Sequence, residues 1–117
     1  MSQETQDDHD NQDAQRSPEA QLLYPLADLY QDDESFVWLI ELPGVSAEGL
    51  DLEVVGGKLV LDATTARQNY RYTRRLKIPA GGDVSEINAS LEDGLLRIEV
   101  RKRVELRARK IALGAKS

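Results

Sequence analysis

Turn-forming residues interrupt the apolar sequence of this chain at short intervals, and this feature limits its fold most. The intervals are roughly 8 to 12 residues, the spacing between turns in antiparallel β-sandwiches. Strands that alternate with helices would need longer uninterrupted segments. The sequence therefore predicts an all-β fold, an immunoglobulin-like antiparallel β-sandwich of about seven to eight strands. Among the interruptions are the pairs Pro43-Gly44, Gly56-Gly57, Gly81-Gly82 and Asp93-Gly94.

Alternation of apolar and polar residues places the individual strands. Residues 50–54 and 87–91 alternate strictly, which predicts strands with all their apolar side chains on one side. Residues 69–78 alternate as one long strand with a basic outer face, and only Arg74 breaks the pattern. Phe36 to Leu42 is almost continuously apolar, which predicts a central strand covered on both faces.

Two glycine-containing pairs predict tight hairpins. Gly56-Gly57 and Asp93-Gly94 each lie between two segments with the composition of strands. Primed hairpin turns require positive φ, which glycine adopts without steric cost. We therefore expect Gly94 to be a structural turn residue with positive φ.

The charge of the chain is distributed unevenly. Residues 1–66 contain 15 acidic and 2 basic residues, a net charge of -13, whereas residues 67–117 contain 6 acidic and 13 basic residues, a net charge of +7. The basic strand within 69–78 resembles a nucleic-acid surface only superficially, because its arginines are expected to face acidic groups of the first half. We expect no nucleic-acid partner.

Residue types exclude most site chemistry and favour a cytoplasmic protein. The chain has no cysteine, and its single histidine, His9, lies in a polar run with no apolar residue to hold it. These facts leave no histidine- or cysteine-based catalysis or transition-metal site, so no enzyme activity, cofactor or metal is expected. No apolar run approaches the roughly 18 residues that span a bilayer, and no membrane partner is expected. Absence of cysteine agrees with a reducing compartment.

Composition divides the chain into three parts. Residues 1–21 are polar and acidic, which predicts a disordered N-terminal arm. Residues 22–102 are expected to form the sandwich, where Pro25 argues for an edge strand or extended lead-in instead of a helix. Residues 103–117 form a basic C-terminal extension, whose first part fits either a short helix or an extended linker.

Four elements in order resemble the alpha-crystallin domain of small heat-shock proteins. They cover about residues 26–101. The resemblance implies ATP-independent holding of partly unfolded client proteins, a role in the stress response and self-association into a homo-oligomer. The elements are Leu42-Pro43-Gly44-Val45, the strand pair around Gly56-Gly57, the arginine-rich strand ending at Ile78-Pro79, and the segment from Ala89 to Leu96 with Gly94 at its turn.

The same resemblance implies where binding occurs. Ile111-Ala112-Leu113 is similar to the tail motif of the family, in which two branched apolar residues flank an arbitrary one. In the family such a tail adds as a strand to a groove of another subunit. The implied groove residues are Leu52, Val54, Ile87 and Ala89, which from their pattern alone fit core positions equally well. Candidate client contacts are Leu22, Leu23, Tyr24 and Leu26.

Two departures from the family bear on assembly. Only residues 63–69 stand where bacterial members have a long loop whose strand is exchanged in a dimer. The single long strand at 69–78 instead resembles that of animal members, which pair this strand edge to edge, and whether this chain does so stays open. We expect a dimer or another small assembly. The arm has no aromatic residue before Tyr24. These departures leave open an adaptor or co-chaperone similar to a CS domain, which would bind one defined protein partner.

Overall fold

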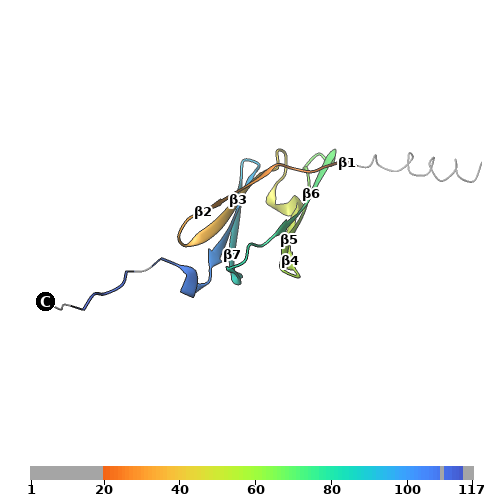
Figure 1. Ribbon diagram of the computed structural model, residues 1–117. Coiled ribbons are helices and arrows are strands. Elements are labelled where there is room, and N and C mark those ends of the chain that lie inside the picture. The colour runs from red at the N-terminus through yellow and green to blue at the C-terminus, as the bar shows by residue number, and fades with distance from the viewer. Residues whose placement is uncertain (1–19, 109, 115–117) are drawn as a thin grey trace, which may run out of the picture.

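The computed structural model describes residues 20–108 and 110–114, in which two four-stranded sheets face each other (Figure 1). One sheet has the order β1-β6-β5-β4 and the other β2-β3-β8-β7. Only the pairing of β1 with β6 is parallel. The prediction of an antiparallel β-sandwich is confirmed. The elements are β1 (Gln21–Leu23), β2 (Ala27–Gln31), β3 (Ser35–Glu41), the 3-10 helix η1 (Ala47–Gly49), β4 (Leu50–Val55), β5 (Lys58–Thr64), β6 (Tyr70–Lys77), β7 (Gly82–Glu92), β8 (Leu95–Lys102) and the 3-10 helix η2 (Val104–Leu106).

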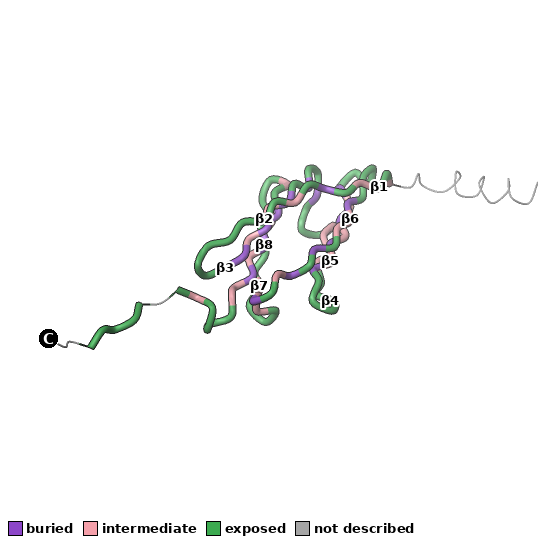
Figure 2. The backbone as a smooth tube through the Cα atoms, viewed as in Figure 1, coloured by how far each residue is buried: buried purple, intermediate pink, exposed green. Residues whose placement is uncertain are grey.

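The core lies between the sheets and comes mainly from their inner strands, β3, β8, β5 and β6 (Figure 2). Buried side chains alternate with more exposed ones along these strands, because successive residues of a strand point to opposite faces. Burying one such aliphatic side chain contributes about 1.5 to 3 kcal/mol. The largest fully buried side chains are Ile40, Leu42, Leu59, Leu61, Leu96, Ile98 and Val100.

Two expectations about side-chain burial were wrong. β3 is an inner strand, but Val37 and Leu39 on its outer face are only half-buried, because nothing in the described part of the chain forms a layer over that face. The alternation of residues 69–78 predicts that Tyr70 faces inward with Tyr72, yet Tyr70 is 38% exposed while Tyr72 is buried. Tyr72 pairs with Ala63, near the end of β5, so Tyr70 extends past the core.

Arg74 breaks the alternation of β6 because it binds the segment that crosses between the sheets. It pairs with Leu61, so its position in the strand faces inward. Its guanidinium Nη1 donates a hydrogen bond to the backbone oxygen of Pro25 at 3.0 Å. Pro25 lies between β1 and β2, which belong to different sheets. The arginine thus holds this crossover over the edge of β6.

Element boundaries differ slightly from expectation. The first strand includes Gln21, one residue before the expected start of the sandwich, while residues 1–19 of the predicted arm lie outside the described residues. β7 begins at Gly82, inside the expected loop. The first part of the C-terminal extension, predicted as either a short helix or an extended linker, has the single 3-10 turn η2 followed by described residues in no helix or strand. Within the described residues, no helix combines the length and apolar character needed to cross a membrane.

The connection between β5 and β6 is a closed turn. Thr65 is buried, and its hydroxyl oxygen accepts hydrogen bonds from the backbone N–H groups of Asn69 and Tyr70, both at 3.2 Å. The hydroxyl also donates to the Asn69 side chain at 2.7 Å. Residues 65–69 therefore turn the chain directly back into the same sheet.

We expect Gly94→Val to lower the free energy of unfolding by about 1 to 3 kcal/mol. Gly94 has a φ of 76°, and Asp93 before it has a φ of 50°, so both residues of the turn have left-handed backbone. A Cβ atom on Gly94 would lie 3.2 Å from the carbonyl oxygen of Leu42. Denaturant midpoints check the effect, with Gly114→Val as control because a Cβ there meets nothing. Equal loss in both variants would contradict the turn assignment.

Candidate functional site

The edge strands β4 and β7 bring the expected groove residues to one side of the sandwich. β1 and β2 are the edges on the other side, because only Tyr24 to Leu26 separate them. This leaves β4 and β7 as the facing edges of the two sheets (Figure 1). We call the row formed by Leu52, Val54, Ile87 and Ala89 the edge seam.

Residues of the edge seam are covered to different degrees. Leu52 and Ile87 are half-buried and pack against the core, whereas Val54 and Ala89 are exposed. Leu52 pairs with Leu61 and Ile87 with Val100, both of which are fully buried. The seam therefore has an apolar base supported by the core and exposed apolar groups beside it. Sequence reasoning omitted Leu50 and Leu91 from the site, although both share the alternation of the seam residues and pack against the core.

Each strand of the seam has a main-chain edge available for pairing. Within the described residues, β4 pairs only with β5, and β7 pairs only with β8. Unpaired backbone N–H and C=O groups along an edge can bind an added extended segment. The seam thus combines a main-chain edge with an apolar surface.

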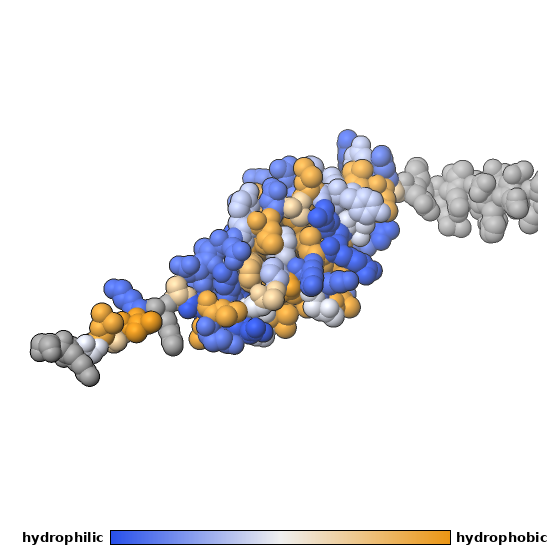
Figure 3. Space-filling view, in the orientation of Figure 1, coloured by the Kyte–Doolittle hydropathy of each residue, from blue (hydrophilic) through white to orange (hydrophobic). Residues whose placement is uncertain are grey.

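The C-terminal motif is exposed in this single chain. Ile111 and Leu113 are 77% and 89% exposed, and neither belongs to a helix or strand. Figure 3 shows apolar surface on this C-terminal segment as well as between the two sheets. Two branched side chains at a spacing of two lie on the same side of an extended segment. The structure does not bring them to the edge seam of their own chain.

The candidate client residues lie at the crossover between β1 and β2. Tyr24 and Leu26 are 71% and 80% exposed, and Leu22 is also exposed. Leu23 instead packs partly against the core. Tyr24 also lines a hollow of about 520 Å³ together with Thr73, Arg74 and Arg75 of β6. The crossover is therefore an apolar surface beside a basic strand.

Charges on the outer face of β5 and β6 form one well-defined ion pair. Arg71 Nη2 lies 2.6 Å from Asp62 Oδ2, and Arg71 Nε donates to Asp62 Oδ1 at 3.0 Å. This hydrogen bonding lowers the pKa of the Asp62 carboxyl below its ordinary value of 3.8, against a small opposing effect of burial. Asp51 lies directly opposite Asp62 on β4, so Arg71 also offsets a repulsion between like charges. Among the described residues, no cluster of histidine, aspartate and glutamate is arranged to hold a metal ion.

Comparison with known proteins decides the family of this chain. Residues 28–113 match the Hsp20/alpha crystallin family. The chain belongs to that family. The resemblance seen in the sequence is confirmed, and the family consists of chaperones, not enzymes. The match favours a small heat-shock protein over an adaptor similar to a CS domain.

Individual relatives have low sequence identity to this chain but align with more than half of it. Small heat shock protein C4 of Rickettsia felis is 24% identical over an alignment of 106 residues that covers 79% of this chain and 65% of that protein. The 16.9 kDa class I heat shock protein 1 of Triticum aestivum is 29% identical and covers 64% of this chain and 60% of its own length. This chain thus spans less than two thirds of both relatives.

Solved structures of the family share the fold. Heat shock protein 16.0 from Schizosaccharomyces pombe superimposes with a TM-score of 0.62 at 25% identity, covering 87% of this chain and 80% of the other. A small heat-shock protein from Xylella fastidiosa, described as having a distinct high order structure, has the same TM-score and identity and covers 78% of this chain and 96% of its own.

We expect Arg71→Gln to lower the free energy of unfolding only slightly at neutral pH, because the ion pair is exposed. The folded-state pKa of Asp62 is depressed, so this stabilisation is present above pH 3.8 and is lost as the pH falls through the folded-state value. Thermal midpoints of the wild type and the variant should converge in acid. Arg75→Gln is the control, since Arg75 lies opposite Val60. A difference in thermal midpoint that persists in acid would show that the stabilisation does not come from the ion pair of Arg71 with Asp62.

Proposed function

We propose that this chain is an ATP-independent holdase that binds partly unfolded proteins and suppresses their aggregation. The observation that carries the proposal is the exposure of large apolar side chains at the β1–β2 crossover of a chain from a chaperone family. A holdase needs apolar surface that binds clients reversibly, and charge that keeps the complex soluble. Tyr24 and Leu26 supply such surface without belonging to the buried core.

The acidic N-terminal segment supplies the second requirement. Residues 1–19 contain six acidic residues and one arginine. They precede β1 and the crossover in the sequence, so each copy carries this negative charge on the same chain as the proposed client surface. Repulsion between such segments would keep complexes dispersed. A cytoplasmic location is part of this proposal, supported by the absence of cysteine from the sequence.

Self-association is proposed to join the C-terminal motif of one copy to the edge seam of another. Ile111 and Leu113 would pack against Leu52, Val54 and Ile87, while the backbone of the motif pairs with a free strand edge. Burying both side chains would contribute roughly 3 to 6 kcal/mol before ordering costs. The resulting assembly is proposed to be a dimer or another small homo-oligomer.

Edge-to-edge pairing of β6 is the second proposed contact, and β1 limits it. β1 covers β6 from Tyr70 to Tyr72. Within the described residues, no strand pairs with the edge of Thr73 to Lys77. A symmetric pair of these edges would bring Arg74, Arg75 and Lys77 close to their counterparts, so it should strengthen with added salt.

We expect the triple variant Leu22→Ser, Tyr24→Ser and Leu26→Ser to lose most of its suppression of aggregation, because it removes exposed apolar surface without opening the core. Light scattering of several unrelated heated clients measures this. Val55→Ser with Val84→Ser is the control, since both valines are exposed elsewhere on the sandwich. Full activity in the triple variant would contradict the client assignment. Suppression limited to one stoichiometric partner would instead support an adaptor.

We expect Ile111→Ala with Leu113→Ala to lower the native mass while leaving the sandwich folded, because the motif makes no contact with the core of its own chain. Light scattering over a dilution series measures the mass, and circular dichroism measures folding. Val104→Ala is the control, as an exposed valine before the motif. A peptide of residues 109–114 should compete with assembly. An unchanged mass at every dilution would contradict the docking proposal.

A further inference from the structure

The beginning of the C-terminal extension is attached to the sandwich by main-chain hydrogen bonds. The backbone N–H of Lys102 donates to the carbonyl of Glu34 at 2.7 Å, and the N–H of Arg103 donates to the carbonyl of Gly81 at 2.8 Å. Glu34 lies in the turn before β3, and Gly81 immediately precedes β7. The extension therefore leaves the sandwich between two loops from different parts of the chain.

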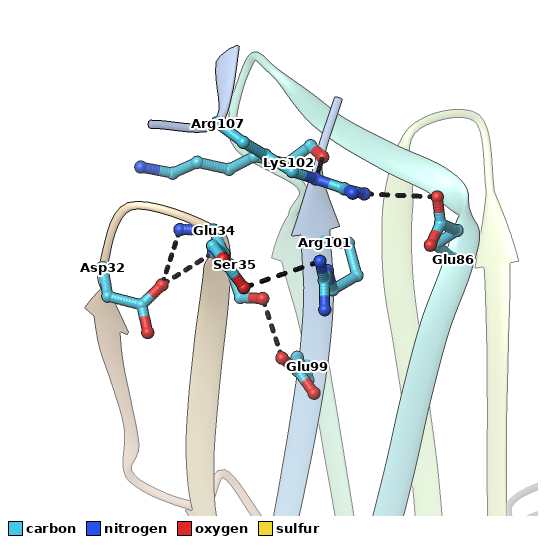
Figure 4. A network of polar contacts seen from close by, with 8 residues as sticks. All are labelled: Asp32, Glu34, Ser35, Glu86, Glu99, Arg101, Lys102 and Arg107. Carbon is cyan, nitrogen blue, oxygen red and sulfur yellow. Dashed lines mark hydrogen bonds and ion pairs between the residues drawn. The ribbon is translucent and has the colours of Figure 1, made fainter. Parts of the chain in front are cut away.

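Two side chains continue this attachment, Leu106 at the end of η2 and Arg107 directly after it. Arg107 Nε donates to the carbonyl of Lys102 at 2.9 Å, and Arg107 Nη2 donates to Glu86 Oε2 of β7 at 3.3 Å (Figure 4). The Arg107 side chain is 21% exposed, so solvent screens this pair less than a fully exposed one. Leu106 packs over Gly81, where a Cβ atom would lie 2.6 Å from its Cδ1.

The attachment of Arg107 shortens the distance over which the C-terminal motif can extend from the sandwich. Three residues separate it from Ile111, so Ile111 can lie at most about 14 Å from Arg107 and Leu113 at most about 21 Å. If the extension were attached only as far as Lys102, Ile111 could reach about 30 Å. The described residues 110–114 also lie away from both sheets (Figure 1). A short tether that points outward favours delivery of the motif to a second copy.

We propose that Arg107 and Glu86 form a positioning pair that holds the start of the C-terminal extension. The pair thereby determines which neighbouring copy can receive the C-terminal motif in its edge seam. The inference rests on the proposed docking of Ile111 and Leu113. A short tether raises the effective concentration of the motif at a seam within its span and excludes seams beyond it. The pair thus selects one arrangement of neighbouring copies without contacting the docked motif.

Full-length Arg107→Gln and Glu86→Gln test this role by native mass spectrometry and analytical ultracentrifugation. Both variants should broaden the distribution of assembly masses, because a longer free tail reaches seams in more arrangements. The double variant should broaden it no more than Arg107→Gln alone, since both changes remove the same contact. Arg103→Gln is the matched control, because Arg103 pairs with Glu105 of the same extension at 3.6 Å. Unchanged distributions in both single variants would overturn the proposal.

Binding of a labelled peptide of residues 109–114 separates positioning from docking. Its affinity for the variants should equal that for the wild type, since the proposed pair acts on the tether and not on the seam. A weaker affinity for Glu86→Gln would overturn the proposal, because Glu86 would then act within the binding surface. Loss of the Ile111 and Leu113 side chains with no change in mass would instead contradict the docking itself.

Discussion

Packing between the inner faces of the two sheets is the interaction on which the rest of the structure depends. β3 and β8 of one sheet supply Ile40, Ile98 and Val100, and β5 of the other supplies Leu59 and Leu61. These side chains are fully buried, so each one removes nearly all of its apolar area from water. Because the sandwich is stabilised from its inner strands, its edge strands are free to carry partly exposed apolar residues.

The edges are accordingly where binding surfaces occur. Leu52 and Ile87 belong to edge strands and rest on the core, so they keep a defined position while one side stays open. On the opposite side, the crossover places Tyr24 and Leu26 in solvent while Arg74 holds its backbone. A site of this kind suits reversible contacts with extended or partly unfolded segments. Deep burial of the same residues would remove them from any partner.

The termini connect these surfaces to assembly. β1 covers only the first part of the β6 edge, and the contacts of Arg107 hold the start of the C-terminal extension beside β7. Each attachment lies next to a segment for which a function is proposed. β1 precedes the crossover, and Arg107 precedes the C-terminal motif. Each therefore affects where that segment can reach, and neither changes the core.

The sequence by itself determined the strands, the turns and the family, because these depend on neighbouring residues: the alternation at 50–54 and the Asp93-Gly94 turn are both local. It failed at Tyr70, which extends past the core, and on the outer face of β3, which no further layer of the described residues covers. Only the tertiary structure decided that β4 and β7 are the facing edges, and that Arg74 binds Pro25 and Arg107 binds Glu86. These contacts join residues far apart in the chain, and the same set of strands is compatible with several orders in a sheet, so no local pattern encodes them.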